Sequence, residues 1–413
     1  MTGKRDIKIL TEILDLSDVK VISHRLHPGI GMILQVESEK SFSICPKCGT
    51  KSHRLHQNHR HIIKDLPFGE NQVFLEINRR QFKCTQCKKP FSEELHFARK
   101  KRTYTKRLAN KIIQEVLEND IHSVAAKGVV TTDEIERMLK DASEELPNLK
   151  PVNLKRLGLD EIALKKGHGN YCAVLVDIDT GKLIAILNGR TQEIIKQTLI
   201  EWGYEILKKI EEVSIDLWSG YKSLVTELMP DAQVIADRFH VMTQINKELD
   251  IQRKVEKRKV GDLIKKANTT DKAKYEELFM GLKDSKYALL KNQDKLTNQQ
   301  LDKLNQVKSV SPILKEMHIL KEKIRKIFNN TKNWYVGVFK LGMWLSRAKK
   351  YFPNSNNTII RWFDEIIAYF DNRTTNGTVE GINNKLKLIK RSGYGFRNFE
   401  NFRVRCLLSW HYI

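Results

Sequence analysis

The chain has 413 residues, 40% of them hydrophobic, which predicts two to four domains with at least one sizeable core. Its 73 Lys and Arg residues against 50 Asp and Glu give a formal net charge of +23, which favours a polyanionic partner over the alternative of a generally basic soluble protein. We find no signal peptide and no run of about 18 apolar residues, so we expect no membrane span and a cytoplasmic location.

Four of the six cysteines form two CxxC pairs, Cys45 with Cys48 and Cys84 with Cys87. Two such pairs can supply the tetrahedral thiolate shell of a structural zinc, and four free thiols are the alternative. The segment between the pairs is longer than in most zinc ribbons, so a hairpin must bring them together, and residues 73–82 alternate as a strand. The intervening histidines could replace a cysteine, but we expect them to face solvent or phosphate; they are His53, His56, His59 and His61.

A strongly basic segment, residues 98–107, leads into three predicted helices at 106–117, 121–127 and 133–142, with Gly128 before the last. Two helices joined by a glycine-containing turn outline a helix-turn-helix, whose second helix enters the major groove of DNA. Helix 133–142 is acidic, so helix 106–117 with the basic segment is an equal candidate for the DNA contact. The cations concerned are Arg137 and Lys140 in the third helix and Arg99, Lys100, Lys101 and Arg102 in the basic segment, which could also be an ordinary charged linker.

Residues 155–240 alternate strand and helix patterns, as an α/β domain does. An Asp-Thr-Gly sequence at 179–181 predicts a hairpin turn. Residues 241–350 show helical periodicity and predict a long helical insertion, and residues 372–413 predict a loop, a helix and a basic stretch with glycines. The predicted strands are 157–164, 171–178, 183–187, 213–217 and 233–236, and the predicted helices among them are 192–210 and 221–228.

Two acids occupy strands of this domain: Asp160 lies within the first strand, and Asp216 ends a later one. Carboxylates held together on neighbouring strands repel each other and attract divalent cations, and oxygen-rich sites suit Mg²⁺. A pair of cations about 3.5–4 Å apart can activate the attacking oxygen and stabilise the leaving oxygen of a phosphoryl transfer. Taken singly, each acid fits a surface or capping role better, so the pattern alone leaves a metal-dependent nuclease or polymerase-like site as one option.

A third acid, Glu380, lies in a predicted helix that begins near residue 375 or 376. At spacings of three and four residues it shares one helical face with amides and cations, an arrangement that suits a metal-bound phosphodiester. The acid would hold metal, and the other side chains would hold phosphates; they are Asn383, Asn384, Lys387 and Arg391. Gly393 and Gly395 are expected to end the helix and open a basic loop that extends to Arg397.

At several segments the chain resembles the DDE transposases of bacterial insertion sequences, and among them the ISL-three family. The similarity covers nearly the whole chain, and its segments are Gly158–Glu161, Ile215–Trp218, Ala236–Val241, Asn376–Gly381 and Lys387–Phe402. The resemblance implies a multidomain chain, with an α/β ribonuclease-H-like core interrupted by an α-helical insertion at about 241–365. It also implies a catalytic triad of Asp160, Asp216 and Glu380 that binds Mg²⁺ or Mn²⁺, with Asp237 as the second choice for the middle position.

The resemblance further implies a zinc-binding DNA-recognition domain at 1–97, a helix-turn-helix domain with linker at 98–150, and a catalytic domain at 151–413. Expected partners are double-stranded DNA, as terminal inverted repeats and as target, and a second copy of the chain; the location is the bacterial cytoplasm at the nucleoid. Arg238 and His240 could contact DNA near the triad or simply start a helix. The full expected DNA-binding set is Arg99, Lys100, Lys101, Arg102, Arg137, Lys140, Arg238, His240, Asn383, Asn384, Lys387, Lys390, Arg391 and Arg397.

Two other functions remain possible from the sequence. One is a transposase-derived DNA-binding regulator without catalysis, although the intact set of acids argues against it. The other is a structure-selective nuclease on the same core. Strand joining between the element's ends and a target separates a transposase from both alternatives.

Overall fold

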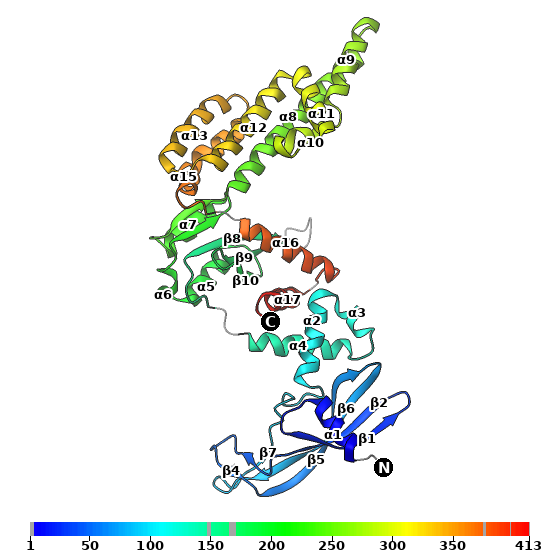
Figure 1. Cartoon of the computed structure of the whole chain (residues 1–413). Helices are drawn as coiled ribbons and strands as arrows, with labels where there is room; N and C mark the ends of the chain where they lie inside the picture. Colours follow the sequence, from blue (N-terminus) through cyan, green and yellow to red (C-terminus); the bar gives the residue numbers. More distant parts are fainter. Residues whose placement is uncertain (1–3, 147–149, 165–170, 375–376, 397, 413) are drawn as a thin grey trace. The chain divides into compact units, whose positions relative to one another are not determined.

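The computed structural model describes residues 4–146, 150–164, 171–374, 377–396 and 398–412 (Figure 1). The chain forms two compact units: unit 1 comprises Met1–Pro147 and Leu388–Ile413, and unit 2 comprises Asn148–Lys387. Residues 388–413, which we expect in the catalytic domain, thus group by contacts with the amino-terminal residues. The three predicted domain boundaries remain predictions.

Unit 1 begins with a helix, α1 (Lys4–Leu14), that packs on a five-stranded sheet. The sheet has the order β1-β2-β6-β5, with β7 also paired to β6, and the β2–β6 pair is parallel. In β6, the apolar residues of the alternating pattern, Val73, Leu75 and Ile77, are buried and face the core. The predicted strand is therefore confirmed. The strands are β1 (Val19–His27), β2 (Gly31–Ser38), β5 (Leu55–Phe68), β6 (Asn71–Lys83) and β7 (Pro90–Ser92), and a small separate pair is β3 (Ser43–Ile44) with β4 (Lys51–Ser52).

Three helices follow the sheet: α2 (Lys106–Glu118), α3 (Ile121–Ala125) and α4 (Thr132–Glu145). Side-chain caps fix their starts; Thr131, for example, forms a capping box with Glu134 at the start of α4. The helix α17 (Phe399–His411) packs against α4 and α2 and buries Leu408 among their apolar residues. Its Arg405 donates to the carbonyl oxygen of Val116 in α2, so the last helix of the chain is part of this core.

Unit 2 contains a second five-stranded sheet of order β10-β9-β8-β11-β12. The first three strands form an antiparallel meander, whereas β8, β11 and β12 run parallel to one another. Asp177 accepts hydrogen bonds from the backbone N–H groups of Asp179 and Thr180, which forms the predicted hairpin turn between β9 and β10. The strands are β8 (Arg156–Ala163), β9 (Tyr171–Asp177), β10 (Lys182–Leu187), β11 (Glu212–Ile215) and β12 (Gln233–Ala236), all at the predicted places.

The helix predicted at 192–210 is wrong in one respect, because it is two helices, α5 (Gln192–Trp202) and α6 (Tyr204–Leu207). Gly203 between them has φ 96°, which a continuing helix of L-residues does not allow. A further helix, α7 (Ser219–Leu228), follows β11 as predicted. The apolar core of the unit includes one face of β11, where Val213 and Ile215 are fully buried.

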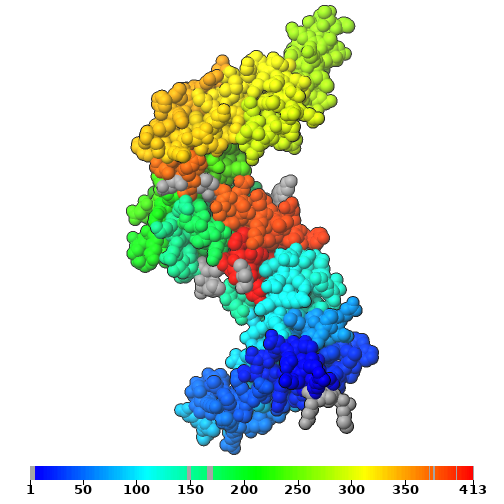
Figure 2. All heavy atoms as spheres, in the orientation of Figure 1, coloured from blue at the N-terminus to red at the C-terminus, as the bar shows by residue number. Residues whose placement is uncertain are grey.

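Helices make up the insertion that follows β12, and Figure 2 shows it as a continuous body coloured mainly yellow. The long α8 (Arg238–Lys266) leads into it from the sheet (Figure 1), and α15 leads back to β12. Asn268, Thr297 and Ser311 cap three of its helices with their side chains. The other helices are α9 (Thr269–Leu282), α10 (Lys286–Leu290), the 3₁₀ turn η1 (Gln293–Lys295), α11 (Asn298–Val310), α12 (Pro312–Asn330), α13 (Trp334–Ala348), α14 (Pro353–Arg361) and α15 (Phe363–Asn372), and α16 (Gly377–Ser392) follows.

None of the helices in the described ranges combines the length and the apolar character that crossing a lipid bilayer requires.

Candidate active site and zinc centre

Asp160 lies on β8, the middle strand of the unit 2 sheet, where it is in register with Val174 of β9. Its Oδ1 accepts a hydrogen bond of 2.6 Å from the backbone N–H of Glu161, and its Oδ2 accepts one of 2.8 Å from Nδ2 of Asn383. Burial raises the pKa of Asp160 to about 6, although the bond from Glu161 acts in the opposite direction. The sheet therefore holds this carboxylate rigidly, in surroundings that call for a cation.

Asp216 directly follows β11, the parallel neighbour of β8. The backbone turns sharply there, because the N–H of Trp218 donates to the carbonyl oxygen of Asp216 at 2.8 Å. Burial raises the pKa of Asp216, and the nearby charge of Glu161 adds to this effect, while His240 opposes it. The two predicted acids are thus brought together by neighbouring strands.

His240 joins these two acids. One ligand atom from each of Asp160, Asp216 and His240 lies within 4.8 Å of the other two. The ring lies in the first turn of α8, with Nε2 4.0 Å from Oδ2 of Asp216 and Nδ1 3.2 Å from Oδ2 of Asp237. Burial lowers the pKa of His240, but the bond to Asp237 and the negative charges of Asp216 and Asp160 outweigh burial and raise it overall.

Asp237 has a different place from the one considered for it in the triad. It is buried, caps α8 by accepting from the N–H of Phe239 at 3.2 Å, and holds the ring of His240. A carboxylate on the outer nitrogen of a histidine is the arrangement that orients the ring toward a metal centre. The signal in the sequence is Asp-x-x-His at the junction of a strand and a helix, of which we connected Asp237 with the triad and His240 only with DNA.

Glu380 lies in the first turn of α16, one turn before Asn383. The hydrogen bond from Asn383 to Asp160 places this part of α16 beside β8. The contact is close because Gly158 has no side chain: a Cβ there would lie 2.5 Å from Cγ2 of Val379. The helix that carries the third predicted acid is therefore packed against the strand that carries the first.

The carboxylate of Glu380 is exposed, and it lines a cavity of roughly 320 Å³ together with Asp237 and Arg238. Within the described ranges, the cluster of ligand atoms around Asp160 contains His240 and does not contain Glu380. The structure thus brings together two of the three predicted acids and leaves the third beside them, on an adjacent helix.

Glu161 is a further acid next to the cluster. Its carboxylate accepts hydrogen bonds from Nη1 of Arg190 at 2.6 Å and from the hydroxyl of Tyr221 at 3.2 Å. Burial raises the pKa of Tyr221, and the charges of Glu161 and Asp216 raise it further. The sequence does not reveal this network, because its three members lie on separate elements, β8, α7 and the segment after β10.

The other side chains predicted to contact DNA in unit 2 have mixed environments. Arg238 donates to Oδ1 of Asn329 at 3.1 Å and stacks on Tyr369, and it lines the cavity that contains Glu380. Asn383 is buried against Asp160, and its own oxygen has no hydrogen-bond partner among the described residues. Asn384 and Lys387 are exposed on α16.

In unit 1, the cations of the basic segment are partly engaged. Arg102 forms a bidentate pair with Asp141, and Arg99 donates to the carbonyl oxygen of Asp141 at 2.9 Å, whereas Lys100 and Lys101 are exposed. The remaining cations predicted to contact DNA here are exposed or half-buried: Arg137 and Lys140 on α4, which line a groove beside α17, and Lys390 and Arg391 on α16; Arg397 lies outside the described residues.

The four cysteines of the two CxxC pairs converge in unit 1, with all sulfur atoms within 4.8 Å of one another. Sulfur–sulfur distances of 3.6, 3.5 and 3.0 Å are close to the roughly 3.8 Å that a tetrahedral zinc–thiolate shell requires. Gly49 and Lys88, one residue past each pair, adopt the left-handed backbone that such tight turns need. The histidines between the pairs are exposed on β5 and its approach and do not belong to this cluster; they are His53, His56, His59 and His61.

Hydrogen bonding with Thr50 and Cys87 lowers the pKa of Cys48 to about 6. Hydrogen bonds with Cys48 and Cys84 in turn raise the pKa of Cys87, as expected where neighbouring thiols share a proton that zinc, which binds thiolates, would displace. The donor set, the spacing of the sulfur atoms and the two turns together identify a zinc ribbon.

Known proteins share both parts. A family model described as Transposase, of the ISL3 DDE type, matches residues 157–406, and a model of the zinc-finger of transposase IS204/IS1001/IS1096/IS1165 matches residues 42–87. The transposase for insertion sequence element IS1001 of Bordetella parapertussis is 26% identical, over 92% of this chain and 91% of its own length. The transposase for insertion sequence element IS1557 of Mycobacterium tuberculosis is 31% identical, over 60% of this chain and 58% of its own length.

Among solved structures, a Drosophila P element transposase strand transfer complex aligns with a TM-score of 0.39 and 12% identity, over 75% of this chain and 92% of that chain. The family model spans more than half of the chain, and the Bordetella relative matches nearly all of it. The chain therefore belongs to the ISL3 family of DDE transposases.

Proposed function

We propose that this transposase binds the terminal inverted repeats of an insertion sequence and uses divalent metal to cut the element's ends and join them to target DNA. The observation that supports this most is the cluster of Asp160, Asp216 and His240, whose ligand atoms lie within 4.8 Å of one another beside β8 and β11 of the sheet. Such a cluster of partly buried acids, with raised pKa values, fits a cation that binds phosphate.

In this proposal Asp160 and Asp216 hold Mg²⁺ or Mn²⁺, which when bound would activate the attacking oxygen and stabilise the leaving one. Asp237 keeps the ring of His240 turned toward Asp216, so His240 orients that carboxylate or accepts a proton beside it. We assign Glu380 as the third acid because its helix is hydrogen-bonded to Asp160 through Asn383 and because its own side chain is exposed in the cavity that Asp237 also lines.

We further propose that unit 2 has a ribonuclease-H-like core. The strand order supports this, because a three-stranded antiparallel meander continues into two parallel strands, with Asp160 on the central strand and Asp216 after its neighbour. The helical insertion follows β12 and ends before Glu380, as the family resemblance implies.

The inverted repeats would be bound by unit 1. The zinc ribbon and the helices α2, α3 and α4, which have the outline of a helix-turn-helix, supply the surfaces for this. The net charge of +23 favours DNA as the ligand. Pairing the two ends of one element would require at least a dimer on DNA. The reaction would take place at the bacterial nucleoid.

Purified protein with Mg²⁺ or Mn²⁺ and DNA that carries the flanking inverted repeats tests the proposal. Asp216→Ala is expected to abolish end cleavage and to leave end binding unchanged, because the surfaces that would recognise the repeats lie in unit 1 and the substitution removes no cation. The matched control is Asp231→Ala, an exposed acid ahead of β12, which should cleave like the wild type. Cleavage without joining to a second DNA would show a nuclease, and loss of binding in Asp216→Ala would make this residue structural.

A further inference from the structure

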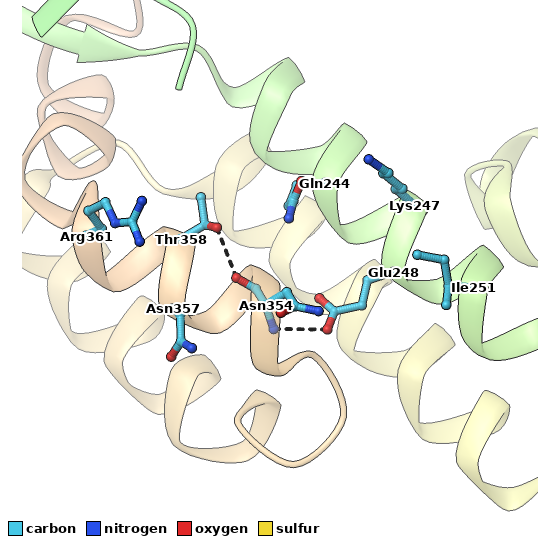
Figure 3. A pocket seen from close by; sticks show the side chains of 8 residues that line it. All are labelled: Gln244, Lys247, Glu248, Ile251, Asn354, Asn357, Thr358 and Arg361. Atoms are coloured by element: carbon cyan, nitrogen blue, oxygen red, sulfur yellow. Dashed lines mark hydrogen bonds between the residues drawn. The ribbon is translucent and has the colours of Figure 1, made fainter. Parts of the chain in front are cut away.

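A cavity of roughly 420 Å³ lies between α8 and α14 in unit 2 (Figure 3). The side chains that α14 contributes are spaced by three and four residues and therefore share one face of that helix. Figure 3 shows Thr358 and Asn354 of α14 turned toward Gln244 and Glu248 of α8, so the cavity is a groove between the two helices. This α8–α14 groove is lined by Gln244, Lys247, Glu248 and Ile251 of α8 and by Asn354, Asn357, Thr358 and Arg361 of α14.

The groove carries a net positive charge. Lys247 and Arg361 are exposed, and neither forms an ion pair with any residue in the described ranges. The carboxylate of Glu248 is buried and already hydrogen-bonded. It accepts from the backbone N–H of Asn354 at 3.0 Å and from the N–H and hydroxyl of Ser355 at 2.8 and 2.6 Å, so it does not repel an anion bound by the two cations. Two free cations among amides suit an anion whose neighbouring atoms can also form hydrogen bonds.

The groove continues a stripe that begins at the candidate active site. His240, Gln244, Lys247 and Ile251 follow one another at spacings of four, three and four residues, so they lie on one face of α8. Seven residues separate His240 from Lys247, which corresponds to about 10 Å along the helix, or about three nucleotides of a DNA strand. A strand whose phosphate lies at Asp160 and Asp216 can thus reach Lys247 along this face.

We propose that the α8–α14 groove binds the sugar–phosphate backbone of the DNA strand that is cut at Asp160 and Asp216, about three nucleotides from the scissile phosphate. This rests on the proposed function. Lys247 and Arg361 contact phosphate, and Gln244, Asn354 and Asn357 donate to sugar or base atoms beside it. Continuity with the acidic cluster favours a DNA strand over a free small anion, since an isolated phosphate site would not need a stripe that leads to His240.

The first experiment compares two double variants with equal loss of charge. Lys247→Ala/Arg361→Ala removes both groove cations, and Lys272→Ala/Lys274→Ala removes two exposed lysines of α9. The dissociation constant of an inverted-repeat duplex with its flanking DNA is measured against salt concentration. The groove variant should bind on the order of tenfold more weakly, and its log–log salt slope should fall by about 1.8, because two phosphate contacts are lost. The α9 variant should keep the wild-type slope, and an equal change in both variants would overturn the proposal.

The second experiment locates the phosphate. Single phosphates of the duplex are replaced by neutral methylphosphonates, and binding is measured without divalent metal, so that the result does not depend on cleavage. Neutralising the phosphate about three nucleotides from the cut should weaken wild-type binding but should not further weaken Lys247→Ala/Arg361→Ala.

If every methylphosphonate affects both proteins equally, or if the groove binds only inorganic phosphate in the DNA-free protein, the proposal is wrong. A wild type that leaves unmodified inverted-repeat DNA uncut in Mg²⁺ and Mn²⁺ would refute the proposed function instead. Cleavage by the wild type together with an unchanged salt slope in the groove variant would refute the groove alone.

Discussion

Asp160 is a residue of the candidate site whose ionised form destabilises the folded chain. Burial raises its pKa to about 6, above the ordinary value of 3.8, so the folded chain prefers the neutral acid. Without metal, its ionisation therefore costs stability above pH 6, and that stability returns as the pH falls from about 6 toward 4. A cation that binds the carboxylate would remove this penalty.

Asp160→Asn is accordingly expected to stabilise the protein at pH 7, in buffer without Mg²⁺ or Mn²⁺, by about 2 to 3 kcal/mol while abolishing cleavage. The oxygen of the new amide can still accept from the N–H of Glu161, and its NH₂ group can donate to Asn383 if that side-chain amide turns over and presents its oxygen, which has no partner in the described structure. Urea unfolding followed by tryptophan fluorescence measures this, since five of the six tryptophans lie in unit 2. The gain in the free energy of unfolding over the wild type should be smaller at pH 5 than at pH 7. A gain that is the same at both pH values would show that the ionisation of Asp160 is not its cause.

His318 of α12 is a second residue with an unusual environment, far from any predicted role. It is fully buried, and neither ring nitrogen has a hydrogen-bond partner within the described part of the chain. Burial lowers its pKa to about 3, and the charges of Lys321 and Lys308 lower it further, while Glu322 acts in the opposite direction. The folded state therefore holds a neutral ring that the unfolded state protonates below about pH 6.5.

This gives His318 a definite effect on acid stability. Because its folded pKa lies below the unfolded one, the wild type should lose about 1.4 kcal/mol per pH unit below pH 6.5 through this group. His318→Leu removes the titration, so the stability of the wild type relative to the variant should fall by about 2 to 3 kcal/mol between pH 7 and pH 4.5. The urea midpoints of the two proteins at pH 7 and pH 4.5 measure this difference in stability. Parallel pH profiles would show that His318 does not cause the loss of stability in acid.

At the scale of elements, the approach of α16 to β8 decides where Glu380 and Asn383 lie. The approach depends on Gly158, since a Cβ there would come within 2.5 Å of Val379. Neither residue can move away easily, because the short side chain of Val379 is fully buried and Gly158 lies within the central strand. Relief of such a clash requires the helix to move.

Gly158→Ala should therefore displace α16, break the bond between Asn383 and Asp160, and reduce cleavage at least tenfold. Val379→Ala in the same chain restores space and should recover most of the rate. Single-turnover cleavage assays of the two variants measure this. A double variant as slow as Gly158→Ala would mean that the glycine acts through the strand and not through the helix.

The elements show what could be predicted from the sequence. The strands of unit 2 and the two CxxC turns were predicted because local alternation and spacing determine them. The break at Gly203 was missed because the surrounding apolar spacing is helical on both sides. His240 was connected with DNA and not with the acids, because its place beside Asp216 depends on how α8 leaves β12, which no local pattern encodes.

Glu380 shows a different limit. Its helix and its face were predicted from spacing, and the structure places that helix beside Asp160. The distance between its carboxylate and the other acids is set by packing between elements more than 160 residues apart in sequence, so the sequence predicts a triad only through the family resemblance. Its role as the third acid stays a prediction.

At the scale of the molecule, the zinc ribbon and the acidic cluster lie in separate compact units. Substitutions at the cysteines should for this reason affect DNA binding and not the fold of the acidic cluster. In contrast, the same substitutions should destabilise the local fold of the zinc ribbon, since Cys45 and Cys84 are buried in a small core with Phe82 and Phe91.

Cys45→Ser/Cys48→Ser is expected to lose about one zinc per chain by metal analysis, because two of four thiolate ligands are gone. Binding to inverted-repeat DNA should weaken at least tenfold, while the tryptophan-detected unfolding of unit 2 stays as in the wild type. Cys172→Ser, a buried cysteine of β9 outside the cluster, is the control and should keep its zinc. Unchanged zinc content in the double variant would show that the cluster holds no metal.

The joining of residues 388–413 to unit 1 has a consequence for the timing of synthesis. Helices α2 and α4 emerge from the ribosome before unit 2, but Leu408 and Arg405, which complete their core, emerge only after it. At about 5–20 residues per second, translation of the intervening unit takes on the order of tens of seconds. Throughout that interval α2 and α4 lack the helix that completes their core. If unit 1 binds the element's ends as proposed, a nascent chain should bind DNA fully only after unit 2 has been synthesised.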